Sequence, residues 1–182
     1  EESEITISKV DIANEAELPG AKLILSGEGI EITKQMVPMG FTHADTVDNL
    51  QRGQYNISNG VLTWISYTDK MKLTKLPDGD YTLTEVAAPE NYEAIGESWK
   101  FTVENGVVVA EDVIHENGTY VKASDTNEDG TKELIVVGNK FIDPEGGDVT
   151  PTEPVTSDTT AETTTPTSTS ESTSTTTTTA SS

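Results

Sequence analysis

The feature that most constrains the fold is the alternation of side chains over residues 80–87, Asp-Tyr-Thr-Leu-Thr-Glu-Val-Ala. Successive side chains of a β-strand point to opposite faces, so Tyr81, Leu83, Glu85 and Ala87 share one face. This face is the more apolar and aromatic of the two, and we expect it to lie in the protein core. A carboxyl group in a core is unfavourable unless it is paired or protonated. Glu85 therefore requires polar partners from other strands.

Short alternating segments recur throughout residues 1–143 and are separated by turn sequences such as Pro77-Asp-Gly79 and Asn105-Gly106. Residues 35–60 are less regular, and we interpret them as a long excursion with a helical turn around residues 46–50. No stretch of ten residues has a clear helical periodicity. Many short strands with frequent turns predict an all-β sandwich or barrel. The predicted strands are residues 5–12, 21–26, 61–67, 70–76, 81–87, 99–104, 107–110 and 133–142, with a weaker candidate at 31–34.

The composition changes sharply near Pro144. Residues 144–182 are mostly Thr, Ser, Pro and acidic residues, with no aromatic residue and no Lys or Arg. Such a segment buries too little apolar surface to offset the entropy of ordering, so we predict that it is disordered. The sequence thus predicts a β-sandwich domain over 1–143 and an acidic Thr/Ser/Pro-rich linker over 144–182 that joins it to adjoining domains. The start at Glu1, without a leader, is typical of a mature or trimmed fragment.

Composition also argues against several classes of function. The formal net charge of −21 repels nucleic acid and anionic membranes. No apolar run approaches the roughly 18 residues that a membrane span needs, so we expect no membrane insertion. The absence of cysteine excludes disulfides, and only two histidines are present. We can place no nucleophile–His–acid arrangement, so we expect neither a cofactor nor an enzyme with turnover.

Three predicted strands each place one polar residue where the alternation calls for an apolar one. Lys9 lies on the apolar face of the first strand, Glu85 on that of a middle strand, and Asn139 on that of the last strand. Together they form a reactive set, because they bring an amine, a carboxyl and a carboxamide to one core. Two other interpretations stay open. Lys9 and Asn139 could be a solvated side chain and a turn residue, or the three could form a buried non-covalent network.

The reactive interpretation follows from the effect of burial, which raises the pKa of a carboxyl group and lowers that of an amine. A neutral Lys9 amine is a nucleophile, and the Asn139 carboxamide is an acyl donor. A protonated Glu85 can donate to the developing oxyanion and shuttle a proton to the departing ammonia. The product is a Lys9–Asn139 isopeptide bond, formed once. Closing a loop of about 130 residues stabilises a fold by roughly 5 kcal/mol in the loop-entropy description.

Three stretches of the sequence resemble the CnaB-type, or SpaA-like, domain of pilins and adhesins. They are Ile5-Thr-Ile-Ser-Lys-Val-Asp11, Leu18-Pro-Gly-Ala-Lys-Leu23 and the Gly-x-Tyr-x-Leu-x-Glu-x-x-Ala-Pro-x-x-Tyr run that ends at Tyr92. The resemblance covers nearly all of residues 4–143. It implies a prealbumin-like (reverse immunoglobulin) β-sandwich from a Gram-positive cell surface. It also implies an isopeptide bond between Lys9 and Asn139, assisted by Glu85.

These observations favour a structural module, the stalk or spacer of a bacterial adhesin, pilin or surface scaffold, located outside the cell at its surface or wall. A second hypothesis is a binding module that presents loops 35–60 and 111–132 to a host or plant glycan or to a matrix protein. Exposed aromatic residues could form a platform for sugar, and the candidates are Trp64, Trp99, Tyr55, Tyr67 and Tyr120. Trp99 alternates with core residues, so we expect it to be buried instead. A hydrolytic enzyme using a carboxylate pair is a third hypothesis, which we disfavour.

One acidic segment resembles the start of a calcium-binding loop, because Asp125, Asn127 and Asp129 place oxygen ligands at alternate positions before Gly130. The twelfth position of such a loop would be Val136 rather than Glu, and flanking helices are missing. An acidic hairpin turn is therefore the better interpretation, and we expect no metal site.

Overall fold

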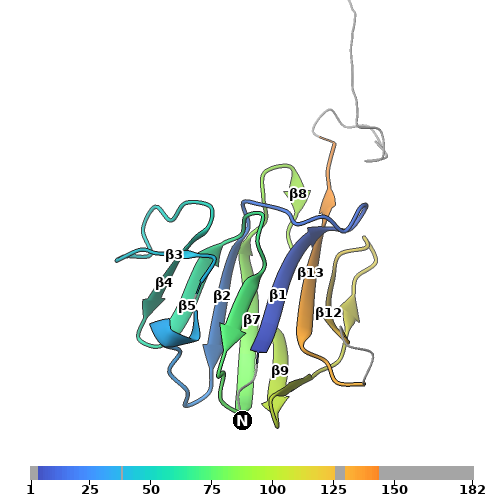
Figure 1. Cartoon of the computed structure of the whole chain (residues 1–182). Coiled ribbons are helices and arrows are strands. Elements are labelled where there is room, and N and C mark those ends of the chain that lie inside the picture. The colour runs from blue at the N-terminus through green and yellow to red at the C-terminus, as the bar shows by residue number, and fades with distance from the viewer. Residues whose placement is uncertain (1–3, 38, 126–129, 144–182) are drawn as a thin grey trace, which may run out of the picture. The chain divides into compact units, whose positions relative to one another are not determined.

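The computed structural model describes residues 4–37, 39–125 and 130–143, whose strands form two sheets that pack as a sandwich (Figure 1). The predicted linker, residues 144–182, lies outside the described residues, as do Asn127 and Asp129 of the calcium candidate. The elements are β1 (Glu4–Asp11), β2 (Lys22–Gly27), the 3-10 helix η1 (Lys34–Met36), β3 (Thr42–His43), β4 (Gln54–Ser58), β5 (Val61–Ile65), β6 (Met71–Thr74), β7 (Gly79–Ala87), β8 (Tyr92–Glu93), β9 (Trp99–Glu104), β10 (Val107–Val109), β11 (Val113–Ile114), β12 (Tyr120–Ser124) and β13 (Leu134–Phe141).

The first sheet has six strands and joins the first and last strands of the described chain. Its order is β11-β12-β13-β1-β6, and the short strand β8 pairs with β13 off this path. β1 and β13 are parallel neighbours, with Lys9 opposite Val137 and Asp11 opposite Asn139. Because side chains two positions apart share a face, this register places Lys9 and Asn139 on the same face of adjacent strands.

The second sheet has seven strands in the order β10-β9-β7-β2-β5-β4-β3. β7 lies in its interior, between β9 and β2. The pairing of β7 with β2 shifts between the pairs Leu23–Glu85 and Lys22–Ala87. This β-bulge directly follows Glu85 and explains why Ala87, predicted to face the core, is exposed.

The core lies between the two sheets, and the alternating apolar residues predicted from the sequence form much of it. On β7, Tyr81 and Leu83 are buried, and on β9 Trp99, Phe101 and Val103 are buried while their neighbours are not. Burial of these side chains is the main force that holds the two sheets together. The prediction of an all-β sandwich is confirmed.

Several local predictions are wrong. Residues 31–34 form no strand, and residues 46–50 contain bends and a turn rather than a helical turn. The excursion 35–60 is not simply a loop, because it contains η1, β3 and β4 and extends the second sheet, with Tyr55 in the core. Likewise, residues 111–132 contribute β11 and β12 to the first sheet. The alternation of Val121 and Ala123, both buried, could have indicated β12.

Candidate functional site

The structure brings Lys9, Glu85 and Asn139 together between the two sheets. Lys9 on β1 and Asn139 on β13 come from the first sheet, and Glu85 on β7 faces them from the second. Their exposed fractions are 2%, 7% and 0%. The structure therefore places all three polar side chains in the core, as the alternation predicted.

The Glu85 carboxyl group lies between the amine and the carboxamide. Its Oε1 is 3.8 Å from Lys9 Nζ, and its Oε2 accepts a hydrogen bond from Asn139 Nδ2 at 3.1 Å. The backbone N–H of Ile95 also donates to Oε2, at 3.0 Å. The two oxygens of one carboxyl group thus face the nitrogens of two different side chains, while a backbone donor fixes the orientation of the group.

The Asn139 carboxamide has a defined orientation. Its Nδ2 donates to Glu85 Oε2 and also to the backbone carbonyl oxygen of Glu93, at 2.9 Å. A backbone carbonyl can only accept, so the nitrogen rather than the oxygen of the carboxamide must face Glu93. Among the described atoms, Asn139 Oδ1 has no hydrogen-bond partner although it is buried. A buried oxygen without a hydrogen-bond partner is unusual in a folded protein, and it marks the Asn139 carboxamide as a candidate for chemistry.

The surroundings of Lys9 make its amine easier to deprotonate than that of an exposed lysine. Burial lowers the pKa of Lys9 from 10.5 to about 8, and this effect outweighs the negative charges of Glu85, Asp11 and Glu17, which raise the pKa. The ammonium group makes only long hydrogen bonds, at 3.3 Å to the carbonyl oxygens of Val10 and Val137. Lys9 is therefore a stronger nucleophile near neutral pH than an exposed lysine would be.

Sequence reasoning missed a short segment that covers this site, residues 92–95, which we call the roof segment. It contains β8, which pairs with β13 through Tyr92–Phe141 and Glu93–Lys140. It contributes backbone groups to the site, the carbonyl of Glu93 and the N–H of Ile95. Backbone groups leave no mark in the sequence, and a two-residue strand has no periodicity to detect.

The site is suited to amide transfer, because it combines a nucleophilic amine, an acyl donor and a carboxyl group in contact with both. A metal site finds no support: in residues 4–37, 39–125 and 130–143, no three His, Cys, Asp or Glu side chains are grouped so as to hold an ion. Of the calcium candidates, the described Asp125 accepts a hydrogen bond from the Gly130 N–H at 2.7 Å, as in an acidic turn.

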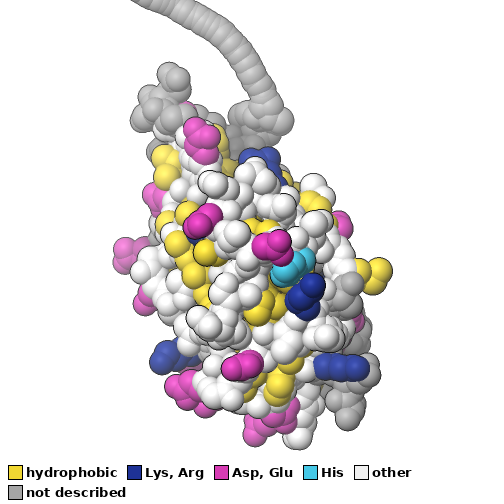
Figure 2. Space-filling model, turned by 90° about the vertical axis from the view of Figure 1, so that its left-hand side faces the viewer, with side chains coloured by type: hydrophobic (Ala, Val, Ile, Leu, Met, Phe, Trp, Pro, Cys, Tyr) yellow, Lys and Arg dark blue, Asp and Glu magenta, His cyan; other side chains and the backbone are white. Residues whose placement is uncertain are grey.

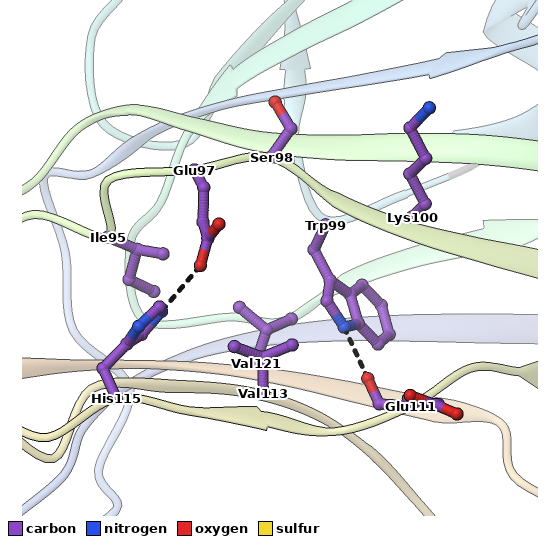
Figure 3. A pocket seen from close by; sticks show the side chains of 9 residues that line it. All are labelled: Ile95, Glu97, Ser98, Trp99, Lys100, Glu111, Val113, His115 and Val121. Carbon is purple, nitrogen blue, oxygen red and sulfur yellow. Dashed lines mark hydrogen bonds and ion pairs between the residues drawn. The ribbon is translucent and has the colours of Figure 1, made fainter.

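A separate pocket of about 330 Å³ lies where β9 of the second sheet faces β11 and β12 of the first (Figure 3). Apolar side chains form much of its lining, and Glu97 reaches toward His115 across it, with 3.7 Å between Oε2 and Nε2. The Trp99 indole N–H donates to the carbonyl oxygen of Glu111 at 2.8 Å. The lining includes Ile95, Trp99, Val113 and Val121.

Three of the five candidates for an aromatic sugar-binding platform are buried, because Trp64 and Trp99 are only 2% and 5% exposed and Tyr55 is also buried. These side chains fill the core, as the alternation of Trp99 with core residues indicated, and they form no exposed platform. Tyr67 and Tyr120 are partly buried. On the face in Figure 2, acidic side chains are dispersed rather than gathered into one patch. In the part of the chain that the structure describes, no helix is long and apolar enough to cross a membrane.

The sequence profile of the SpaA family, described as a prealbumin-like fold domain, matches residues 3–117. The chain belongs to this family. The match confirms the resemblance drawn from residues 5–92 and includes Lys9 and Glu85. It ends before β12 and β13 and so does not include Asn139, whose assignment depends on the alternation along the last strand, the resemblance and the structural contacts. A search of curated proteins found no match to this sequence.

Among solved structures, a comparison found similarity to the pilus 2b backbone protein of group B streptococcus, at 17% identity over 77% of this chain and 41% of that chain, with a TM-score of 0.43. The pilus adhesin RrgA of Streptococcus pneumoniae has 19% identity over 78% of this chain and 15% of that chain, with a TM-score of 0.45. The pilus-presented adhesin Spy0125 (Cpa) has 19% identity over 72% and 36%, with a TM-score of 0.38. The chain spans less than half the length of each of these proteins.

Proposed function

We propose that this chain is a structural module of a Gram-positive cell-surface protein, a stalk or spacer of pilin or adhesin type. We propose further that it is strengthened by an isopeptide bond between Lys9 and Asn139. The observation that supports the bond is that one buried carboxyl group, that of Glu85, contacts both nitrogens, at 3.8 Å and 3.1 Å. Membership of the SpaA family supports the structural role.

In the proposed reaction, the neutral Lys9 amine attacks Cγ of Asn139. The Nζ–Cγ bond forms, the Cγ–Nδ2 bond breaks, and the amide nitrogen leaves as ammonia. Glu85 Oε1 lies on the side of the attacking nitrogen and Oε2 on the side of the leaving nitrogen, so one carboxyl group can take the proton from the first and deliver it to the second. The products are one isopeptide and one ammonia, with no external reactant.

A bond at this position would strengthen the domain against a pulling force. It joins β1 and β13, the first and last strands of the described chain, which lie side by side in parallel. A force applied to both ends of the domain would act on these two strands, and a covalent link between them lets the force bypass the hydrogen-bonded sheets. The bond would also supply a covalent staple in a chain without cysteine.

The module acts outside the cell, at the bacterial surface or wall, and its partners are adjoining domains connected through residues 144–182. We propose residue 143 as the end of the folded domain, since β13 ends at Phe141. The reaction occurs once per chain, so the protein is not an enzyme with turnover.

Intact-mass measurement tests the bond. The folded wild-type chain should be lighter than its sequence mass by one ammonia molecule, and Lys9→Ala and Glu85→Ala should each restore the full mass for their sequences. Lys72→Ala, which removes an exposed lysine from the neighbouring strand β6, is the matched control and should keep the ammonia loss. A wild-type mass equal to the sequence mass would rule the bond out.

The pocket between β9 and β11 favours a second function, binding of a glycan or a matrix protein by the 111–121 segment. An array of glycans and matrix proteins probed with the wild type and with Val113→Trp, which fills the pocket, tests it. Binding that the substitution abolishes supports this function. An absence of binding across the array leaves the spacer role by itself.

A further inference from the structure

We infer that Tyr92 is a positioning residue for the proposed amide transfer, because its hydroxyl group ties the roof segment to β1 and so holds the groups that orient Glu85 and Asn139. This inference rests on the proposed function, and it adds a residue that does not itself touch the reacting atoms.

The roof segment orients two of the three members of the site. The Glu93 carbonyl accepts from Asn139 Nδ2 at 2.9 Å, and the Ile95 N–H donates to Glu85 Oε2 at 3.0 Å. The first contact fixes the orientation of the Asn139 carboxamide, so that its nitrogen can also donate to Glu85. The second holds the Glu85 carboxyl group between Lys9 Nζ and Asn139 Nδ2. A displacement of the segment would therefore disturb the acyl donor and the proton shuttle together.

The segment needs an additional tether because its pairing is short. β8 has two residues, and two register pairs connect it to β13. A ladder of that length is weak by itself. Two contacts of Tyr92 reinforce it: the ring packs edge-on against Phe141 at 5.5 Å between centroids, and the hydroxyl donates to Asp11 Oδ2 at 2.6 Å.

The hydrogen bond from the Tyr92 hydroxyl to Asp11 is not lost through deprotonation of the tyrosine. Burial raises the pKa of Tyr92, and the hydrogen bond to the Asp11 carboxylate raises it further, so the hydroxyl keeps its proton and remains a donor. Asp11 is itself fixed, because its other oxygen accepts from the Ala13 N–H at 2.8 Å. This hydrogen bond is partly buried, and a hydrogen bond to a charged acceptor is stronger than one between neutral groups.

Asp11, which accepts the hydrogen bond from Tyr92, lies on the same strand as the nucleophile Lys9. Asp11 lies two residues after Lys9 on β1 and directly opposite Asn139 on β13. The Tyr92–Asp11 bond therefore fixes the roof segment relative to the same strand that carries the amine. Through it, the positions of the nucleophile, the acyl donor and the proton shuttle become coupled.

The test compares rates of ammonia loss in full-length chains. Each chain is recovered in denaturant, its uncrosslinked fraction at time zero is determined by intact mass, and it is then diluted to refold. Samples are quenched in acid at intervals and weighed, while the fluorescence of the buried Trp64 and Trp99 follows folding. Tyr92→Phe should fold and then lose ammonia about ten- to a hundredfold more slowly than the wild type, the range expected for small misplacements of reacting groups.

Tyr81→Phe is the matched control. It removes a tyrosine hydroxyl from the same fold with a hydrogen bond of the same length, 2.6 Å, to the Pro77 carbonyl oxygen, away from the site. It should leave the rate of ammonia loss in folded chains unchanged. Equal rates for wild type and Tyr92→Phe, or equal slowing by both substitutions, would overturn the positioning role. Ammonia loss absent from the wild type would instead refute the proposed function on which the inference rests.

Asp11→Asn supplies a second test that also serves if too few Tyr92→Phe chains fold. It weakens the same hydrogen bond from the other side. Removing the Asp11 charge by itself lowers the pKa of Lys9, which would speed the reaction. If Asp11→Asn loses ammonia more slowly than the wild type, the change is opposite to the electrostatic effect and supports the positioning role of the Tyr92–Asp11 hydrogen bond. A rate equal to or above that of the wild type contradicts this role.

Discussion

The rate of isopeptide formation should depend on pH in the manner of an amine whose pKa is about 8. Only the neutral form of Lys9 is nucleophilic, and burial lowers its pKa from 10.5 to about 8. The neutral fraction is then about one tenth at pH 7 and about one hundredth at pH 6. The rate should rise about tenfold for each pH unit up to pH 8 and level off above it.

The timed refolding of full-length wild-type chain, repeated from pH 6 to pH 10, measures this dependence. Tryptophan fluorescence of Lys9→Ala, which should fold but cannot form the crosslink, gives the rate of folding at each pH, so that slow folding is not mistaken for slow chemistry. A rate that continues to rise up to pH 10 would show that Lys9 behaves as an exposed amine. A rate that does not change between pH 6 and pH 8 would show that deprotonation of the amine is not required. Either result would refute the reasoning.

Three further predictions concern the same site. Glu85→Gln keeps the shape of the side chain but cannot shuttle a proton, so the variant should fold, by circular dichroism, and retain its ammonia by intact mass. Asn139→Ala cannot form the crosslink, so its Lys9 keeps a free amine. Its unfolding free energy should rise by about 3 kcal/mol between pH 8 and pH 10.5, because the folded state binds fewer protons than the unfolded state over this range. Urea titrations measure this rise, and Lys9→Met, which has no amine to titrate, is the control. Gly138→Ala places a Cβ 2.7 Å from the Tyr120 ring and should destabilise the fold by about 1–3 kcal/mol in the same titrations.

The sequence predicted the reactive set because alternation is a property of strands that does not require knowledge of their pairing. The apolar neighbours of Lys9, Glu85 and Asn139 on their own strands were enough to predict that all three face the core, and they do. The alternation alone did not predict that β1 and β13 are adjacent. That pairing is a long-range contact, and the expectation came from the resemblance to the SpaA-like domain.

The parts that the sequence did not predict have identifiable physical causes. β4 was missed although Tyr55 and Ile57 alternate with polar residues, because two apolar residues in a five-residue strand give only a weak pattern. Asn56 on its opposite face is also buried, and its Nδ2 donates to the Ala44 carbonyl at 3.0 Å. The roof segment was missed because it acts through backbone groups. Tyr92 was noticed as part of a sequence motif, but its contact with Asp11 spans 81 positions and depends on the arrangement of both sheets.

The most direct test of the isopeptide bond is tandem mass spectrometry of a protease digest of the folded wild-type chain. The account predicts a branched peptide in which the side chain of Lys9 is joined to that of Asn139 with the loss of one ammonia. Recovery of both residues in separate, unmodified linear peptides, with no branched species, would contradict it.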